Sequence, residues 1–284
     1  MTLHLLARPH HPAAPASATV WKMLFDRQQA LLHRWARPEI TRALAELGLR
    51  RDALPNPTAL AQLVHQRTGW TLLFTGAPVA EAAYYAALAR RELPVVSRLR
   101  TFSEFDQPPG GPDLFTDALG RLPLLLEAGY ADALQQLGQA WALATTPAAL
   151  GLLRRFARAT FELGLLAGAP GARPQPYGTA LLTAPGPLHA LAAAEAAQLR
   201  PLAGAARYLA LQAAPGAALL AEASAYFVAQ SWAELSAELH QLRQELAATQ
   251  RPALGPHTTS APNVSATGRA QAFAARVSSL RQVE

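Results

Sequence analysis

The most informative part of this chain is Pro112-Asp113-Leu114-Phe115-Thr116-Asp117-Ala118-Leu119-Gly120-Arg121-Leu122-Pro123-Leu124-Leu125. A loop rich in proline and glycine at 108–112 precedes it and interrupts the regular pattern. Two long helical patterns follow it, at 130–144 and 147–167. The stretch therefore lies at the entrance to the most helical part of the chain.

The spacing of apolar residues on either side predicts a mainly α fold with a few short β-strands. Further helices are expected at 18–47 with a break at Pro38, at 56–68, at 79–91 and at 231–248. Short extended segments are expected at 70–74, 94–99, 177–182 and 226–228.

Composition divides the chain into three parts. Residues 1–17 are rich in proline, alanine and histidine, and we expect a disordered leader there. Residues 18–248 are expected to form one domain, which is long enough to bury a substantial core. At 249–284 proline, serine, threonine and asparagine accumulate, and a disordered tail is expected.

Charge and cysteine content narrow the classes of partner and compartment. The chain has 25 basic and 19 acidic residues, but Lys22 is its only lysine and the arginines are scattered. We therefore predict no nucleic-acid partner. No apolar run reaches the roughly 18 residues of a membrane span, and the amino terminus does not resemble a signal peptide. With no cysteine in the chain, we expect a cytoplasmic protein without a membrane partner.

Residues 112–125 resemble the metal-binding segment of the pterin-dependent aromatic amino acid hydroxylases, the phenylalanine 4-monooxygenase family. The family pattern is Pro-Asp-x-x-His-Asp/Glu-x-x-Gly-His-x-Pro-Leu. Collinear matches extend over about 19–245, at Trp21 with Arg27-Gln28, Thr68-Gly69-Trp70, Thr160–Leu165, Tyr177-Gly178 and Tyr226-Phe227-Val228. The resemblance implies the fold of the family's catalytic domain. It also implies a reaction that hydroxylates an aromatic ring with O₂, Fe(II) and tetrahydrobiopterin.

The same resemblance questions the iron site. The family holds Fe(II) with two histidines and one carboxylate, an arrangement that leaves positions open for O₂. The carboxylate corresponds to Glu162, but Thr116 and Arg121 correspond to the two histidines. A threonine hydroxyl is a poor neutral ligand and a guanidinium has no lone pair to give. We therefore expect a vestigial metal position at Glu162, no cofactor, and no catalytic residue; whether the chain is an enzyme stays open.

A physical replacement for the metal is an ion pair between Arg121 and Glu162, in which the guanidinium supplies the positive charge. The alternative is that Arg121 points to solvent from a helix end.

Four other positions correspond to binding residues of the family. Arg100 corresponds to an arginine that binds the substrate carboxylate, and Thr183 to a serine of the substrate pocket. Tyr84 corresponds to a ring on which the pterin stacks, and Asp117 to an acid that orients the pterin. Ordinary packing or surface roles stay open for Arg100, Tyr84 and Asp117. The family's aromatic pair before Thr160 is replaced by Ala157 and Arg158, and the pterin loop at 76–79 matches poorly.

Three functions remain. The first is a degenerate or repurposed relative that binds an aromatic amino acid and assembles with itself or with an active paralogue. The second is an active iron- and pterin-dependent hydroxylase with an unusual metal site. The third is a metal-free enzyme in which Asp117, Glu162 and Arg121 form an acid–base cluster.

Overall fold

The computed structural model describes residues 15–106, 111–195, 198–211 and 225–248. Nearly all of the predicted leader and the whole tail beyond 248 lie outside the described residues, so their disorder stays a prediction. Helix α1 begins at Pro15, three residues before the predicted start of the domain.

The amino-terminal helices begin and end where local signals place them. α1 spans Pro15–Trp35 and α2 spans Pro38–Glu46, so the break predicted at Pro38 is confirmed. Proline fits the first turn of a helix because its missing N–H would have no partner there.

Helix α3, Pro57–Thr68, has both ends fixed by side chains that suit them. The Asn56 side chain accepts hydrogen bonds from the backbone N–H groups of Thr58 and Ala59, at 3.0 and 3.2 Å. Gly69 follows the last turn in a left-handed conformation with φ 71°, which glycine adopts without strain.

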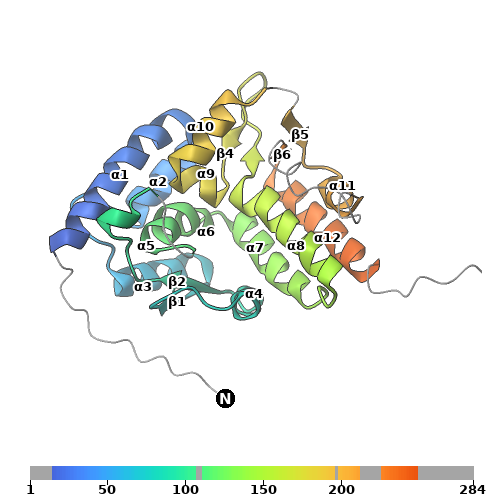
Figure 1. The fold of residues 1–284 in the computed structure, drawn as a ribbon, viewed down its shortest axis with the longest axis horizontal. Coiled ribbons are helices and arrows are strands. Elements are labelled where there is room, and N and C mark those ends of the chain that lie inside the picture. Colours follow the sequence, from blue (N-terminus) through green and yellow to red (C-terminus); the bar gives the residue numbers. More distant parts are fainter. Residues whose placement is uncertain (1–14, 107–110, 196–197, 212–224, 249–284) are drawn as a thin grey trace, which may run out of the picture. The chain divides into compact units, whose positions relative to one another are not determined.

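A small parallel sheet follows α3. Strands β1, Thr71–Thr75, and β2, Glu92–Val96, are joined through helix α4, Glu81–Ala89. Figure 1 shows the strands beside α3 and α4. Both strands were predicted, although β2 begins and ends earlier than 94–99.

The central stretch at 112–125 is a helix interrupted by a wider turn. After the 3₁₀ turn η1, Phe102–Glu104, the chain forms α5, Leu114–Thr116, the π-helical turn η2, Asp117–Arg121, and α6, Leu122–Leu125. A π-helical turn inside a helix often accompanies a functional site.

Two long helices come next, and the second also ends in a π-helical turn. α7 spans Ala128–Trp141 and α8 spans Pro147–Ala157, followed by η3, Arg158–Glu162. The helix predicted at 147–167 is shorter than expected, because the helical segment ends at Glu162.

Gly138 lets α7 approach α4 closely, since a Cβ at this position would lie 2.4 Å from the backbone nitrogen of Ala89.

The segment 177–182 corrects the prediction of a strand. The strand there is short, β4 at Gln175–Pro176, and the chain then forms helix α9, Thr179–Thr183, and helix α10, Pro185–Ala193. Gly178 lies against the backbone of Glu162, and its missing side chain permits this contact.

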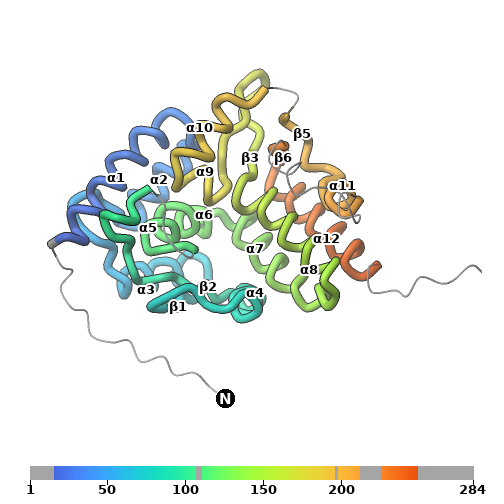
Figure 2. Tube along the Cα trace, in the orientation of Figure 1, coloured from blue at the N-terminus to red at the C-terminus, as the bar shows by residue number. Residues whose placement is uncertain are grey.

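The remaining strands build a second sheet. Strands β3, Leu165–Leu166, β5, Leu199–Pro201, and β6, Tyr226–Ala229, join β4 in the order β4-β3-β6-β5. β6 pairs in parallel with both neighbours, and Figure 2 shows β3 and β6 side by side. Helix α11 spans Ala205–Leu211 and α12 spans Trp232–Ala248.

The core contains several fully buried aromatic side chains among its leucines and alanines. The largest fully buried side chains include Trp21, Trp70, Phe115, Tyr130 and Phe156. Long helices with a few short strands confirm the predicted mainly α fold. Among the described helices, none combines the length and the apolar character that crossing a membrane requires.

Candidate functional site

Two cavities meet in the helical part of the molecule and share three lining residues. The larger has a volume of about 330 Å³ and the smaller of about 70 Å³. Arg121, Glu162 and Thr179 line both of them. They come from η2, η3 and α9, so both π-helical turns end on residues of the site.

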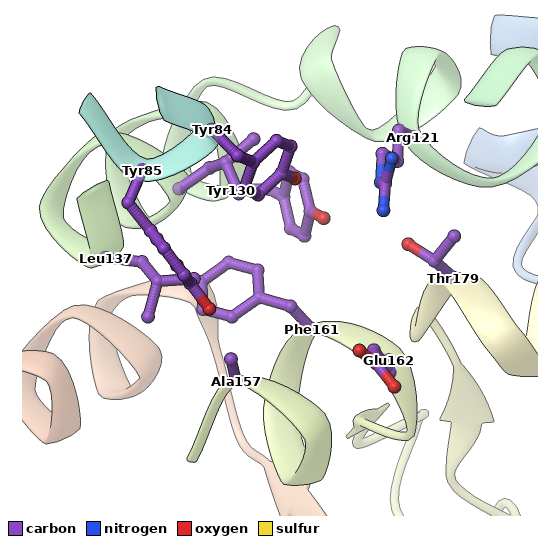
Figure 3. A pocket seen from close by; sticks show the side chains of 10 residues that line it. Tyr84, Tyr85, Arg121, Tyr130, Leu137, Ala157, Phe161, Glu162 and Thr179 are labelled. Atoms are coloured by element: carbon purple, nitrogen blue, oxygen red, sulfur yellow. The ribbon is translucent and has the colours of Figure 1, made fainter. Parts of the chain in front are cut away.

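The smaller cavity has an aromatic side and a polar side. Figure 3 shows the rings of Tyr84, Tyr85, Tyr130 and Phe161 facing the side chains of Arg121, Thr179 and Glu162. Burial raises the pKa of Tyr84 and of Tyr130, so both phenols are neutral near pH 7. The smaller cavity therefore has neutral aromatic rings on one side and charged and hydroxyl groups on the other.

Arg121 is held in place from two sides. It donates a hydrogen bond from Nη1 to Asp117, one turn earlier in η2. Its guanidinium carbon also lies 5.4 Å from the ring centroid of Tyr84, within the range of a cation–π contact. With 20% of its side chain exposed, Arg121 presents part of its guanidinium to the cavities, so the alternative of an arginine turned out to solvent does not describe it.

Asp117 is a fully buried carboxylate. The backbone N–H of Val96 donates to its Oδ2 at 2.8 Å, and Arg121 binds its Oδ1. Burial raises the pKa of Asp117 above its ordinary value, and the Arg121 charge and the Val96 hydrogen bond offset part of that effect. Asp117 thus positions Arg121; its predicted role toward a pterin stays a prediction.

The predicted ion pair between Arg121 and Glu162 is wrong. The partner of Glu162 is Arg158, at 3.6 Å between Nη1 and Oε2, and the side chain of Glu162 is 51% exposed. The expectation assumed a buried carboxylate that needed a cation. Each charged group instead pairs with a residue four positions earlier in its own helical turn.

Thr116 and Arg100 belong to one polar cluster around Asp113. The Asp113 carboxylate accepts hydrogen bonds from the Thr116 backbone N–H and hydroxyl, at 3.0 and 2.8 Å. The same carboxylate also accepts hydrogen bonds from Nε and Nη2 of Arg100. Nη1 of Arg100 donates a hydrogen bond to the Phe105 carbonyl oxygen. Arg100 and Thr116 both line the larger cavity.

The remaining predicted site residues lie in the same region. Tyr84 lines the smaller cavity and Thr183 the larger. The Thr183 hydroxyl donates to the backbone oxygen of Thr179 at 2.7 Å. Their roles toward a pterin and a substrate are not tested by this geometry and stay predictions.

The site also contains residues for which no site role was predicted. Thr179, Tyr130 and Phe161 line the smaller cavity, and Arg27 lines the larger one. Thr179 fell in a segment interpreted as a strand, so its position on a helix end was missed. The only signal for Tyr130 was an aromatic residue at the start of a helical pattern, which is more typical of a core residue.

The donor set does not fit an iron centre of two histidines and a carboxylate. Thr116 and Arg121 stand where the resemblance expects the histidines. Within the described ranges, no group of three histidine, cysteine, aspartate or glutamate side chains is arranged to hold a metal ion.

Comparison with family models matches residues 13–282 to the biopterin-dependent aromatic amino acid hydroxylases. The phenylalanine-4-hydroxylase of Ralstonia nicotianae is 32% identical over 170 residues, which make up 59% of this chain and 53% of that protein. The aligned part of the chain thus spans about half the length of the curated relatives it matches.

Solved structures share the fold. Phenylalanine hydroxylase from Legionella pneumophila matches with a TM-score of 0.69 and 22% identity over 84% of this chain and 95% of that one. Phenylalanine hydroxylase from Chromobacterium violaceum, with bound iron(III) and 7,8-dihydrobiopterin, matches with a TM-score of 0.68 and 23% identity over 84% and 85%.

These comparisons correct the expectation that the protein uses no cofactor, which is wrong. The matched family is biopterin-dependent, and the similar chain from Chromobacterium violaceum holds iron and an oxidised pterin. That expectation rested on the two replaced metal-ligand positions, on the aromatic pair replaced by Ala157 and Arg158, and on the poor match of the pterin loop at 76–79. A pterin is a flat ring that other side chains can bind through stacking and hydrogen bonds.

Proposed function

The chain belongs to the biopterin-dependent aromatic amino acid hydroxylase family, and we propose that it is a repurposed member whose larger cavity binds an aromatic amino acid. The position of Arg121 carries this proposal. A guanidinium paired with the buried Asp117 lies where the family resemblance expects an iron-binding histidine. A guanidinium at this position can bind an anionic group of a ligand, and hydroxylation through the family's iron centre is not expected.

The cavity has the size and lining that such a ligand requires. Its volume of about 330 Å³ exceeds the roughly 150 Å³ of an apolar cavity that takes up benzene. Arg100 and Thr183, the two residues predicted to contact the amino acid, both line it. Because the family is biopterin-dependent, tetrahydrobiopterin is the cofactor we expect beside the amino acid. We also propose that the protein is cytoplasmic.

Titration calorimetry tests the binding. L-Phenylalanine, L-tyrosine and L-tryptophan are titrated into the full chain with and without tetrahydrobiopterin, and L-leucine serves as the aliphatic control. We expect saturable binding of an aromatic amino acid and at least tenfold weaker binding of L-leucine. Equal affinity for L-leucine, or no binding of any aromatic amino acid, would contradict the proposal.

A turnover assay tests the loss of hydroxylation. The protein is incubated with Fe(II), tetrahydrobiopterin, O₂ and L-phenylalanine, and hydroxylated product is measured by chromatography. We expect none above the background without protein. Product that requires both iron and pterin would instead support the active hydroxylase, the alternative consistent with the names of the relatives.

A matched variant makes a negative result informative. The paired substitutions Thr116→His and Arg121→His complete the ligand set that Glu162 begins. Elemental analysis after incubation with Fe(II) is expected to find more iron in this variant than in the parent. Equal iron in both proteins would show that these two positions do not control metal binding.

A further inference from the structure

We propose that Arg121 and Glu162 bind the α-carboxylate and the α-ammonium group of the amino acid, at the border between the two cavities. This inference rests on the proposed function and adds the side chains that hold the ligand's head group. It differs from the prediction that Arg100 binds the carboxylate, and the two can be separated by experiment.

Arg100 has little binding capacity left. A guanidinium offers five N–H donors. Those of Arg100 are directed to the two Asp113 oxygens, to the Phe105 carbonyl and to the Thr116 hydroxyl, at 2.8 to 3.2 Å. Its side chain is 4% exposed. One N–H remains, which is too few for a two-point contact with a carboxylate.

Arg121 has most of its donors available. Among the residues that the structure describes, its hydrogen-bond partner is Asp117, which takes a single bond from Nη1. The contact with the Tyr84 ring fixes the guanidinium plane without using an N–H in that plane. Arg121 can therefore present a pair of parallel N–H groups to a carboxylate, the geometry in which arginine binds carboxylates best.

Glu162 is the acidic group that faces the same space. It lines both cavities together with Arg121, and Figure 3 shows the two charged side chains and the Thr179 hydroxyl directed into the space opposite the tyrosine rings. Its ion pair with Arg158 is long, and both side chains are more than half exposed. Such pairs contribute little, so an ammonium group can displace Arg158 at small cost.

The volumes of the two cavities determine which of them can hold the aromatic ring of the amino acid. An apolar cavity of about 150 Å³ takes up benzene. The smaller cavity, at about 70 Å³, is too small, whereas the larger one at about 330 Å³ is large enough. The ring therefore lies in the larger cavity against Pro112, Ala180 and Pro185, with the head group at the border.

Three ligands distinguish the contact of Arg121 with the carboxylate from the contact of Glu162 with the ammonium group. L-Phenylalanine carries both head groups, 3-phenylpropionate lacks the ammonium, and 2-phenylethylamine lacks the carboxylate. Their affinities are measured by calorimetry, or by competition with L-phenylalanine where direct titration is too weak. This comparison is made on the full chain and on each variant.

Each substitution is expected to affect only the ligands that carry its group. Arg121→Gln should weaken L-phenylalanine and 3-phenylpropionate about 10- to 100-fold, the usual effect of losing a charged hydrogen bond, and leave 2-phenylethylamine within twofold. Glu162→Gln should weaken L-phenylalanine and 2-phenylethylamine and spare 3-phenylpropionate. Equal loss for all three ligands, or no loss, would overturn the inference.

Arg100→Lys distinguishes the competing assignment. If the carboxylate-dependent loss appears in Arg100→Lys and not in Arg121→Gln, Arg100 binds the carboxylate and the inference is wrong. If the unaltered chain binds none of the three ligands, the proposed function itself fails. The two failures are therefore distinct.

Controls guard against loss of folding. Arg42→Gln changes an arginine that also pairs with an acid of the preceding turn, Glu39, but is 74% exposed and lines neither cavity. It should leave all three affinities unchanged. If Arg121→Gln does not fold, the paired substitutions Asp117→Asn and Arg121→Gln remove both charges of the buried pair, and the same selective loss is expected.

Discussion

Arg100 and Asp113 form a buried ion pair with two parallel contacts. Nε lies 2.8 Å from Oδ2 and Nη2 lies 2.9 Å from Oδ1, and the two side chains are 4% and 3% exposed. The same carboxylate caps helix α5 through the Thr116 backbone N–H. The pair thus ties the chain after β2 to the start of the stretch at 112–125.

We expect Asp113→Asn to lower the free energy of unfolding by about 3–5 kcal/mol at pH 7, because it leaves the Arg100 charge buried and unpaired. Urea unfolding followed by circular dichroism measures this. Asn56→Asp, a change at an exposed cap that keeps a capping oxygen, is the control and should cost less than about 1 kcal/mol.

The pH dependence of this difference follows from the pKa of Asp113. Burial, the largest single influence, raises that pKa, but the Arg100 hydrogen bond and charge and the Thr116 hydrogen bonds outweigh it, so the pKa lies below its ordinary value. A lowered pKa stabilises the fold above the unfolded value near 4, and that stabilisation is lost as the pH falls through the folded pKa. The gap between parent and Asp113→Asn should therefore narrow below about pH 4. A gap that is constant from pH 7 to pH 3 would rule out this linkage.

Gly120 permits the contact between η2 and α9. A Cβ there would lie 2.6 Å from Cγ2 of Thr179 and 2.8 Å from Cγ2 of Thr183. Gly120→Ala should cost about 1–3 kcal/mol of unfolding free energy through overpacking and weaken ligand binding, since Thr179 lines both cavities. Gly76→Ala is the matched control, because a Cβ there meets no atom within 4 Å. Similar losses in both variants would show that close packing at Gly120 is not the cause.

Ala157 lines the smaller cavity at the end of α8. Ala157→Leu should fill it and raise the free energy of unfolding by about 1 kcal/mol, since each buried methylene contributes about 0.8 kcal/mol before ordering costs. Affinity for L-phenylalanine should stay within twofold, because the ring is placed in the larger cavity. Ala149→Leu, at a buried position that lines neither cavity, should instead destabilise the fold. Lost affinity in a stable Ala157→Leu would show that the ligand enters the smaller cavity.

The N-cap of α3 gives a prediction that does not depend on the site. Asn56→Ala removes the acceptor for two backbone N–H groups and should cost about 1 kcal/mol, within a usual range of roughly 0.5–2. Thermal unfolding at fixed pH measures it. Should Asn56→Asp lose as much as Asn56→Ala, the capping oxygen would not be responsible.

Local signals in the sequence predicted local structure well. The break at Pro38, the cap at Asn56 and the end at Gly69 each depend on one residue and its immediate neighbours. The family resemblance added the global fold. The helix at Thr179–Thr183 was missed because its leucines and threonines also suit a strand, and the close approach of Gly178 to Glu162 is a tertiary contact that spacing does not reveal.

The candidate site was predicted only in part. Arg121 and Glu162 were both predicted to lie at the site, but the ion pair predicted between them was wrong. The sequence does not give the three-dimensional distance between two side chains. The observed partners, Asp117 and Arg158, each stand four residues before the group they bind. Side chains four residues apart on one helical face commonly interact, so this spacing could have identified both pairs.

The π-helical turns η2 and η3 make the cavities sensitive to chain length. Each holds a residue more than an α-helix would over the same span. A one-residue deletion within 117–121 removes that extra residue, so the segment can close into a regular α-helix over the same span. The flanking helices α5 and α6 then keep their places, but the wider turn in which Asp117 holds Arg121 at the cavities is lost. A deletion within 158–162 does the same to the turn that carries Glu162. The site therefore depends on the number of residues in each turn as well as on their identity.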